Sequence, residues 1–342
     1  MPNADAPDET PPKDVDDSGF PRIPGYRILS RIGAGSFADV YKAIQLKLQR
    51  TVALKVLPPI LASEREALEN LIREARAAAR ISHENIVAVY DVGVADQWAF
   101  FAMEFVDGNS LEKLIRRGGP MDERRALQIG LQVARALEHA WNFRIIHRDI
   151  KPSNILINRR SVVKLCDLGF ARGVLSERDK ENQGLTVGTP HYISPEQARG
   201  LSETDIRSDI YSLGATLYHA VTGKPPFTGD SIPEIMAKHV SEDPVPVNVL
   251  VEHLTPPTVH FISRMMAKDP ARRYDPATLV KDLEANQSGE FRVPAGSFSD
   301  SSLALLAQEN RGKKTRGRKS PSGRHVKKRT RKKRMGRKKR RS

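Results

Sequence analysis

The sequence has little cysteine and no long hydrophobic run. Its 342 residues include one cysteine, Cys166, so the chain cannot form an internal disulfide, and a reducing compartment is expected. No apolar run approaches the roughly 20 residues that a membrane-spanning helix needs. The first 20 residues are acidic and proline-rich, unlike the basic and then apolar start of a secretion signal. We therefore expect a cytoplasmic protein without a membrane span.

Acidic residues are missing from the C-terminal end. Residues 311–342 hold 19 of the 56 lysines and arginines and no Asp or Glu, which leaves 37 basic and 41 acidic residues in 1–310. The formal charge of +15 is thus concentrated in this tail. Self-repulsion should keep the tail extended, and counterion release should favour nucleic acid or another polyanion. Since the tail has no aromatic residue for base stacking, we expect non-specific binding, with nucleoid or nuclear association as a possibility.

Composition divides the chain into four regions. Residues 1–25 are acidic and poor in bulky apolar residues, so we predict a disordered leader. Residues 26–287 carry regular strand and helix patterns and should form the folded unit. Residues 288–310 are weakly patterned and are interpreted as a linker, and 311–342 as a disordered polybasic tail.

Strand patterns come first in the folded unit and helix patterns follow. Runs of β-branched and aromatic residues predict five strands, at Tyr26–Leu29, Val40–Ile44, Thr51–Leu57, Ile86–Asp91 and Trp98–Phe105. Ser63 and Glu66 resemble a capping box at the start of one helix between these strands. After Gly108, apolar stripes predict two long helices, through Ala126, Ile129, Val133, Leu137 and Ala140, and through Ile210, Leu213, Leu217 and Val221. A mainly β part should therefore precede a mainly α part.

Three features of the first part are suited to phosphate binding. The small residues of Gly33–Val40 lie between two predicted strands, where backbone N–H groups can approach phosphate oxygens, although an ordinary glycine-rich hairpin is an equal alternative. Lys55 lies on the next predicted strand, and Glu74 lies within the predicted helix. Each could instead be a surface charge, with Glu74 paired to Arg73 or to a neighbouring turn.

The decisive run is His147–Asn154, with the sequence His-Arg-Asp-Ile-Lys-Pro-Ser-Asn, followed by Asp167-Leu168-Gly169. Together with the glycine loop, Lys55 and Glu74, these segments resemble the serine/threonine protein kinase family, of the eukaryotic-like bacterial type. The resemblance covers residues 26–287. It implies an α+β, bilobal protein kinase fold, with a small antiparallel-sheet lobe and one regulatory helix at 26–105 and a larger, mainly helical lobe at 107–287.

The resemblance also implies catalytic roles for matching residues. Asp149 orients the substrate hydroxyl and accepts its proton, while Lys151 lies near the transferred phosphate. Asn154 and Asp167 hold Mg²⁺, with Mn²⁺ as an alternative, because their oxygens suit a hard cation. Lys151 at this position favours serine and threonine acceptors over tyrosine.

The resemblance implies a nucleotide site built from both lobes. Lys55 contacts the α- and β-phosphates of ATP with Glu74 as its partner, and Thr189 bridges to Asp149 and Lys151. Residues expected around the nucleotide are the loop residues Gly33, Ala34, Gly35, Ser36 and Phe37, the apolar walls Ile32, Val40, Ala53 and Leu156, the gate residue Met103, and the backbones of Glu104 and Val106.

Other matching residues are expected to support or regulate the site. Glu196 should pair with Arg273, and Asp209 should brace the catalytic loop. In this family the arginine that Arg148 matches often binds a phosphorylated residue of the activation segment, the stretch that follows Asp167-Leu168-Gly169. We hypothesise Thr186, then Ser176, as that residue. A hydroxyl on a mobile loop without such a role is an equal alternative for Thr186.

Three positions depart from the family pattern without removing a catalytic group. Ala38 stands at the third glycine position, Leu168 where phenylalanine is commoner, and Ser194 where alanine is usual. We therefore interpret the chain as an ATP-dependent protein serine/threonine kinase that acts on protein substrates and on itself. A pseudokinase scaffold and a polyanion-binding protein tethered by its tail are the alternatives. Catalytic motifs do not encode the physiological substrate, the upstream signal or the oligomeric state.

Overall fold

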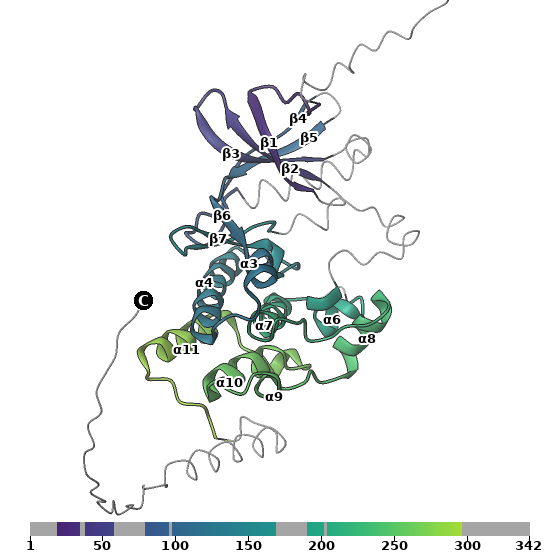
Figure 1. Ribbon diagram of the computed structural model, residues 1–342, viewed down its shortest axis with the longest axis vertical. Coiled ribbons are helices and arrows are strands. Elements are labelled where there is room, and N and C mark those ends of the chain that lie inside the picture. Colours follow the sequence, from purple (N-terminus) through teal and green to yellow (C-terminus); the bar gives the residue numbers. More distant parts are fainter. Residues whose placement is uncertain are drawn as a thin grey trace, which may run out of the picture. The chain divides into compact units, whose positions relative to one another are not determined.

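The computed structural model describes residues 19–34, 38–57, 79–95, 98–168, 190–201 and 204–295 (Figure 1). Its first part is a five-stranded antiparallel sheet in the order β1-β2-β3-β5-β4. The strands are β1 Tyr26–Ala34, β2 Asp39–Gln45, β3 Arg50–Leu57, β4 Val89–Ala95 and β5 Trp98–Glu104. All five predicted strands therefore exist.

The pleat of β3 gives the sheet two differently packed faces. Ala53 and Leu57 pack in one cluster with Phe101 and Met103, whereas the alternate residues of β3 pack in a second cluster, which comprises Val52, Leu54 and Val56 among others. Lys55 lies opposite Val40 on β2 and Phe101 on β5. Because alternate residues of a strand share a face, Lys55 lies on the face of Ala53 and Leu57.

The fourth strand differs from its expected range. Prediction placed it at Ile86–Asp91, but β4 begins at Val89, and Ile86 forms an isolated parallel bridge with Leu165. The N–H of Val87 donates to the carbonyl of Leu165 at 2.9 Å, and the N–H of Leu165 donates to the carbonyl of Asn85 at 2.8 Å. Ile86 and Val87 are buried and β-branched, so their composition is strand-like, but their partner, Leu165, lies outside the first sheet.

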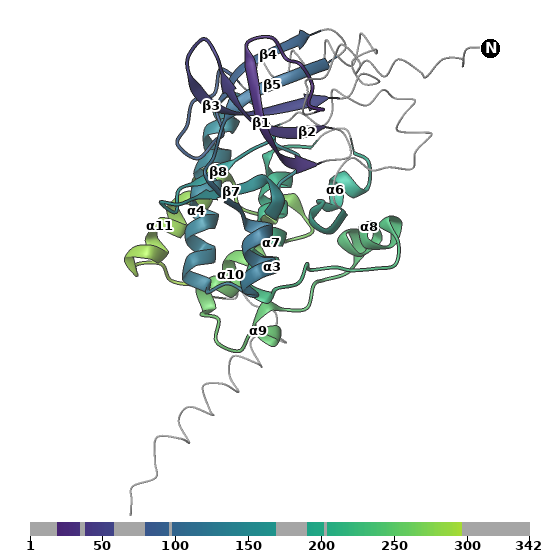
Figure 2. The same cartoon turned by 45° about the horizontal axis from the view of Figure 1, so that its top comes forward.

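Helices dominate from residue 111 onward. They are α3 Leu111–Gly118, α4 Glu123–Asn142, α6 Pro195–Ala198, α7 Ile206–Thr222, α8 Ile232–Ser241, α9 Val247–Leu250, α10 Pro256–Met265 and α11 Pro276–Ser288, with 3-10 turns η1 Pro152–Asn154, η2 Pro190–Tyr192 and η3 Pro270–Arg272. The apolar stripes predicted for α4 and α7 are buried, which confirms both helices. The α+β class with a sheet lobe and a helical lobe is as the resemblance implies (Figures 1 and 2).

Close helix packing at α7 depends on a glycine. A Cβ on Gly214 would lie 2.7 Å from the Cβ of Met265 in α10, which is nearer than such atoms approach in proteins. Helix α7 begins after Asp205, whose side chain accepts from the N–H of Arg207, and it ends at Gly223 with φ 75°. The position of α7 fixes Asp209, which lies in its first turn.

A second, three-stranded sheet brings together one strand that precedes α3 and two strands that follow α4. It consists of β6 Gly108–Ser110, β7 Ile155–Asn158 and β8 Val163–Leu165, in the order β6-β7-β8. Asn158 shapes the β7–β8 turn, because its side-chain oxygen accepts from the N–H groups of Arg160 and Val162, each at 2.9 Å. Strand β7 directly follows the catalytic loop, His147–Asn154, and β8 ends just before Cys166 and Asp167.

Both boundaries predicted for the folded unit are too narrow. Ile23 is buried, and the Phe20 ring packs edge-on to Tyr41 with centroids 5.5 Å apart, so the packed chain begins before residue 26. Helix α11 continues to Ser288, and the Phe291 ring lies 4.7 Å from that of Phe261. A segment of low average hydrophobicity can still place one ring in a core, and its average composition does not indicate this.

Within the described ranges, no helix combines the length and the apolar character that crossing a bilayer requires.

Candidate functional site

The catalytic loop brings three of the expected site residues into contact. The Oδ2 atom of Asp149 lies 2.8 Å from Nζ of Lys151 and accepts from Nδ2 of Asn154 at 3.0 Å. The same Asn154 nitrogen also donates to the backbone carbonyl of Asp149 at 2.9 Å. The loop therefore holds a carboxylate, an ammonium group and an amide in one hydrogen-bonded group.

Asp209 fixes the backbone of this loop from helix α7. Its two carboxylate oxygens accept from the N–H groups of His147 and Arg148, each at 2.7 Å. Burial raises the pKa of Asp209 even though His147 and Arg148 favour its ionised form. Arg148 has φ 67°, a left-handed conformation that a non-glycine residue keeps only when its surroundings fix it. Asp209 thus has the bracing position that the resemblance implies.

Lys55 and Asp167 form an ion pair between the two lobes. Nζ of Lys55 lies 2.7 Å from Oδ1 of Asp167, and both side chains are largely shielded from solvent. Burial opposes ionisation of both groups, but mutual attraction outweighs it, so the pKa of Asp167 is lowered and the pKa of Lys55 is raised. Asp167 is therefore a carboxylate at neutral pH.

Two hydrogen bonds link the catalytic loop to the segment of Asp167. The N–H of Cys166 donates to the carbonyl of Asn154 at 3.0 Å, and the His147 ring nitrogen Nε2 lies 2.8 Å from the carbonyl oxygen of Cys166. Burial, followed by the charge of Asp167, raises the pKa of the Cys166 thiol well above its ordinary value. Cys166 thus contributes its backbone to the site and keeps its thiol protonated.

The donor atoms near Asp167 fit a hard divalent cation. Because Nδ2 of Asn154 donates to Asp149, the amide presents Oδ1 as its acceptor, and Asp167 supplies an ionised carboxylate. These are the oxygen ligands that Mg²⁺ prefers. Among the described side chains no three His, Cys, Asp or Glu residues form a metal-binding group.

Most residues expected around adenine share one apolar cluster. Ala53 and Met103 are buried in it, and Val40, Val106 and Leu156 pack against it. Ile32 is the exception in exposure, since 41% of it is accessible. The N–H of Glu104 donates to the carbonyl of Ala88 at 2.8 Å, so this residue has its carbonyl rather than its N–H to offer a nucleotide. Ala38 also belongs to the cluster, at the position where the family usually has glycine.

Several expected site residues lie outside the described ranges. They are Gly35, Ser36, Phe37, Glu74, Ser176, Thr186 and Thr189. Gly33 and Ala34 lie within the described ranges and are the last residues of β1. Leu168 is described and buried, next to Asp167.

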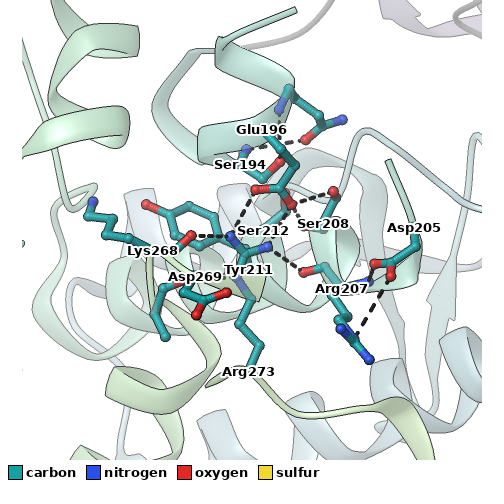
Figure 3. Close-up of polar contacts among 12 residues, drawn as sticks. Ser194, Glu196, Asp205, Arg207, Ser208, Tyr211, Ser212, Lys268, Asp269 and Arg273 are labelled. Atoms are coloured by element: carbon teal, nitrogen blue, oxygen red, sulfur yellow. Dashed lines mark hydrogen bonds and ion pairs between the residues drawn. The ribbon is translucent and has the colours of Figure 1, made fainter. Parts of the chain in front are cut away.

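Glu196 and Arg273 form the ion pair that the resemblance implies (Figure 3). The two side chains point toward each other, with Nη1–Oε1 and Nη2–Oε2 distances of 2.6 and 2.8 Å. The Ser208 hydroxyl also donates to Oε1 of Glu196, at 2.5 Å. Burial alone would raise the pKa of Glu196, but the hydrogen bonds and charge of Arg273 lower it. This fully hydrogen-bonded pair anchors α6 to the end of the helical lobe.

Two contacts near the site were not expected from the sequence. The Gln197 side chain donates from Nε2 to the carbonyl of Arg148 at 3.1 Å, and Lys164 forms an ion pair with Glu104 at 2.8 Å. Glu104 is itself expected at the nucleotide through its backbone, and Lys164 stands shortly before Asp167, but nothing in the sequence pairs the two side chains. Nothing local in the sequence marks Gln197 as a partner of the catalytic loop.

Comparison with known proteins gives consistent matches. The family described as "Protein kinase domain" matches residues 26–283. Serine/threonine-protein kinase PknB of Mycobacterium tuberculosis is 40% identical over 271 residues, which are 78% of this chain and 43% of that protein. The probable serine/threonine-protein kinase CPE1738 of Clostridium perfringens is 40% identical over 260 residues, 76% of this chain and 38% of the relative. PknB of Mycobacterium leprae is 38% identical over 292 residues, 84% and 47% respectively. The matched stretch is thus less than half of each of these relatives.

Proposed function

This chain belongs to the protein kinase domain family, and from that premise we propose that it transfers the γ-phosphate of ATP to serine and threonine hydroxyls of proteins. The observation that carries the proposal is the hydrogen-bonded group of Asp149, Lys151 and Asn154. The backbone bond from Cys166 to Asn154 connects this group to the Lys55–Asp167 pair. The similarity to proteins named serine/threonine-protein kinases supports the same acceptor class.

The proposed chemistry is an in-line transfer of a phosphoryl group. The substrate hydroxyl oxygen forms a bond to the γ-phosphorus while the bond to the β-phosphate oxygen breaks, and ADP leaves. Asp149 orients the hydroxyl and accepts its proton. Lys151, which lies 2.8 Å from Asp149, places positive charge beside the transferred group.

The other residues bind and orient the nucleotide. We propose that Lys55 contacts the α- and β-phosphates, with Glu74 as a second partner, and that the apolar cluster around Ala53 and Met103 receives adenine. Asn154 and Asp167 are the proposed ligands of Mg²⁺ or Mn²⁺. When bound, such a cation neutralises charge on the phosphate oxygens.

For the activation segment, which follows Asp167-Leu168-Gly169, the proposal includes one phosphate site and one bridging residue. Arg148 is the proposed receptor for a phosphate on Thr186 or Ser176, and Thr189 the proposed bridge to Asp149 and Lys151. The backbone of Arg148 is held by Asp209, so a phosphate contact there would act next to the proposed base.

The first prediction tests phosphoryl transfer itself. Incubation of the purified chain with γ-labelled ATP, Mg²⁺ and a basic protein should give phosphoserine and phosphothreonine, measured by phosphoamino-acid analysis. Asp149→Asn removes the proton acceptor and should lower kcat by about 100-fold or more. Asp230→Asn, at an exposed site near α8, is the matched control and should retain activity. Absence of transfer by the wild-type chain would instead support a pseudokinase scaffold, in which the same residues bind nucleotide without chemistry.

We propose as a second function that residues 311–342 bind nucleic acid or another polyanion without sequence preference. The density of 19 basic residues and no acidic ones supports it. A cytoplasmic setting, with association to the nucleoid or nucleus through this tail, is part of the same proposal.

The second prediction concerns this tail. The full chain should bind duplex DNA in low salt, and the affinity should fall by at least about tenfold between 50 and 200 mM salt because counterion release drives binding. A truncation to residues 1–310 should lose this binding while it keeps its kinase rate. Equal DNA binding by both forms in a fluorescence-anisotropy titration would overturn the tail proposal.

A further inference from the structure

Gln197 makes one more contact than a helix-capping residue needs. It lies in the short helix α6, where its backbone N–H donates to Oγ of Ser194 at 3.3 Å and its Oε1 accepts from the N–H of Ser194 at 3.2 Å. This reciprocal pair is a capping box. The remaining side-chain atom, Nε2, donates to the carbonyl oxygen of Arg148 at 3.1 Å, in the catalytic loop.

Only one orientation of the Gln197 amide satisfies both of its partners. The N–H of Ser194 is a donor and requires the oxygen, whereas the Arg148 carbonyl is an acceptor and requires the nitrogen. A rotated amide would place two donors together and two acceptors together. The capping interaction therefore aims the NH₂ group of Gln197 at the catalytic loop.

The Arg148 carbonyl belongs to the peptide that leads directly into Asp149. Asp209 fixes the N–H side of Arg148 at 2.7 Å, and Gln197 holds its carbonyl side. Arg148 has φ 67°, so its backbone depends on neighbouring contacts to keep this conformation. Because both the N–H and the carbonyl of Arg148 are held, the orientation of the Arg148–Asp149 peptide is fixed, and the Asp149 backbone starts from a defined position.

The support for Gln197 is rigid. The preceding residue, Glu196, is held by two hydrogen bonds from Arg273 and one from Ser208 (Figure 3). Ser194 is fully buried at the start of the same helix. A displacement of Gln197 relative to α7 would have to break these contacts, so α6 can serve as a fixed reference for the catalytic loop.

We propose that Gln197 is a positioning residue, which orients the Arg148–Asp149 peptide and so aligns the Asp149 carboxylate with the acceptor hydroxyl. The inference rests on the proposed kinase function and deepens it. It also gives α6 a role in catalysis besides its structural one, because Gln197 in this helix contacts the peptide that leads into Asp149.

The test separates the donor from the cap. Gln197→Glu keeps the oxygen that accepts from Ser194 but loses the donor to Arg148, and Gln197→Met loses both. Ser194→Ala removes the hydroxyl of the capping box and leaves the Gln197 side chain intact. Gln128→Glu, the same substitution at an exposed position of α4, controls for added charge.

At neutral pH we expect kcat for protein phosphorylation to fall about tenfold in both Gln197 variants, which corresponds to one lost hydrogen bond. The KM for ATP should stay within about twofold, because the Gln197 amide contacts Ser194 and the Arg148 carbonyl and the proposed effect is on the acceptor side. Ser194→Ala and Gln128→Glu should keep near wild-type kcat. Melting temperatures of all four variants, measured in parallel, identify any variant that fails to fold.

The pH profile is the readout that a purely structural role would not change. When the carboxyl of Gln197→Glu is protonated, its O–H can donate to the Arg148 carbonyl while its other oxygen still accepts from Ser194. The kcat of Gln197→Glu relative to wild type should therefore recover as pH falls from about 8 to about 5.5, since a carboxylate facing a carbonyl has a raised pKa. The ratio for Gln197→Met should stay flat.

The outcomes distinguish the two proposals. Wild-type kcat in both folded Gln197 variants, or equal losses in Ser194→Ala and Gln197→Met, would overturn the positioning role alone. A flat pH ratio for Gln197→Glu would overturn it as well. A wild-type chain that transfers no phosphate would overturn the kinase proposal, and the role of Gln197 with it.

Discussion

Glu196 is a buried carboxylate that the protein keeps ionised, since its pKa is lowered. Its side chain is 9% exposed and that of Arg273 is 0% exposed, yet both charges are compensated by direct hydrogen bonds. The Arg273 guanidinium also lies over the Tyr211 ring, 4.9 Å from its centroid, and donates to the carbonyls of Ala267, Arg207 and Lys268. Removing either charge would leave the other buried and uncompensated, which costs more than the pair itself contributes.

The third prediction follows from this environment. Glu196→Gln should lower the free energy of unfolding by about 3–5 kcal/mol, because Arg273 is left as an unpaired buried cation. Urea denaturation followed by circular dichroism measures the loss. Glu234→Gln makes the same substitution in the more exposed pair with Lys238 and should have only a small effect. Similar losses in both variants would contradict the importance of burial here.

The lowered pKa of Glu196 also sets the direction of a pH effect. Since the folded-state pKa lies below the unfolded one, the pair contributes its full stability above about pH 4.5 and loses it as pH falls through the folded-state value. The stability difference between wild type and Glu196→Gln should therefore narrow in acid. A difference that is constant from pH 7 to about 3 would contradict this assignment.

At the scale of elements, the two lobes are joined by backbone and side-chain contacts at β8. Residues 85–87 pair with Leu165, and Nδ2 of Asn85 donates to the carbonyl of Val163 at 2.9 Å. Lys164, between these two β8 residues, reaches Glu104 at the end of β5. Glu104 also accepts from the N–H of Ala88 at 3.3 Å. The strand that leads to Asp167 is thereby tied to the last strand of the first sheet.

The fourth prediction measures this link. A double-mutant cycle of Glu104→Gln and Lys164→Met in urea denaturation should give a coupling energy of about 1 kcal/mol, within the range of about 0.5–3 for contacting residues. The exposed pair of Asp107 and Arg159, with side chains 63% and 81% accessible, is the matched control and should couple weakly. Equal coupling in the two cycles would show that partial burial does not strengthen the Glu104–Lys164 pair.

Local patterns were enough for elements that pair or pack with their sequence neighbours. The strands β1 to β3 and β5 followed from runs of β-branched and aromatic residues, and the stripes of α4 and α7 followed from helical spacing. The range of β4 and the sheet β6–β8 did not, because their short segments take partners far along the chain. Strands of three or four residues, such as Val163–Leu165 in β8, carry too little pattern to be recognised alone.

At the scale of the whole molecule, the family resemblance carried by the motifs implied the two lobes and the residues of the candidate site. The structure adds which atoms meet: Lys151 and Asn154 share one oxygen of Asp149, and Asp209 holds two backbone N–H groups. A sequence cannot show such geometry, because it depends on the path of the backbone between motifs. The contact from Gln197 is the clearest case, since its partner Arg148 lies 49 residues away.

The rings of Phe20 and Phe291 have a practical consequence for anyone who expresses this domain. A fragment limited to the family match at 26–283 would lack Phe20, Phe291 and the last residues of α11. The rings of Tyr41 and Phe261 would then lose these packing partners and become exposed to solvent. Apolar rings that become exposed in this way favour aggregation and a low yield of soluble protein. A fragment that spans residues 19–295 keeps both the Phe20–Tyr41 and the Phe291–Phe261 contacts.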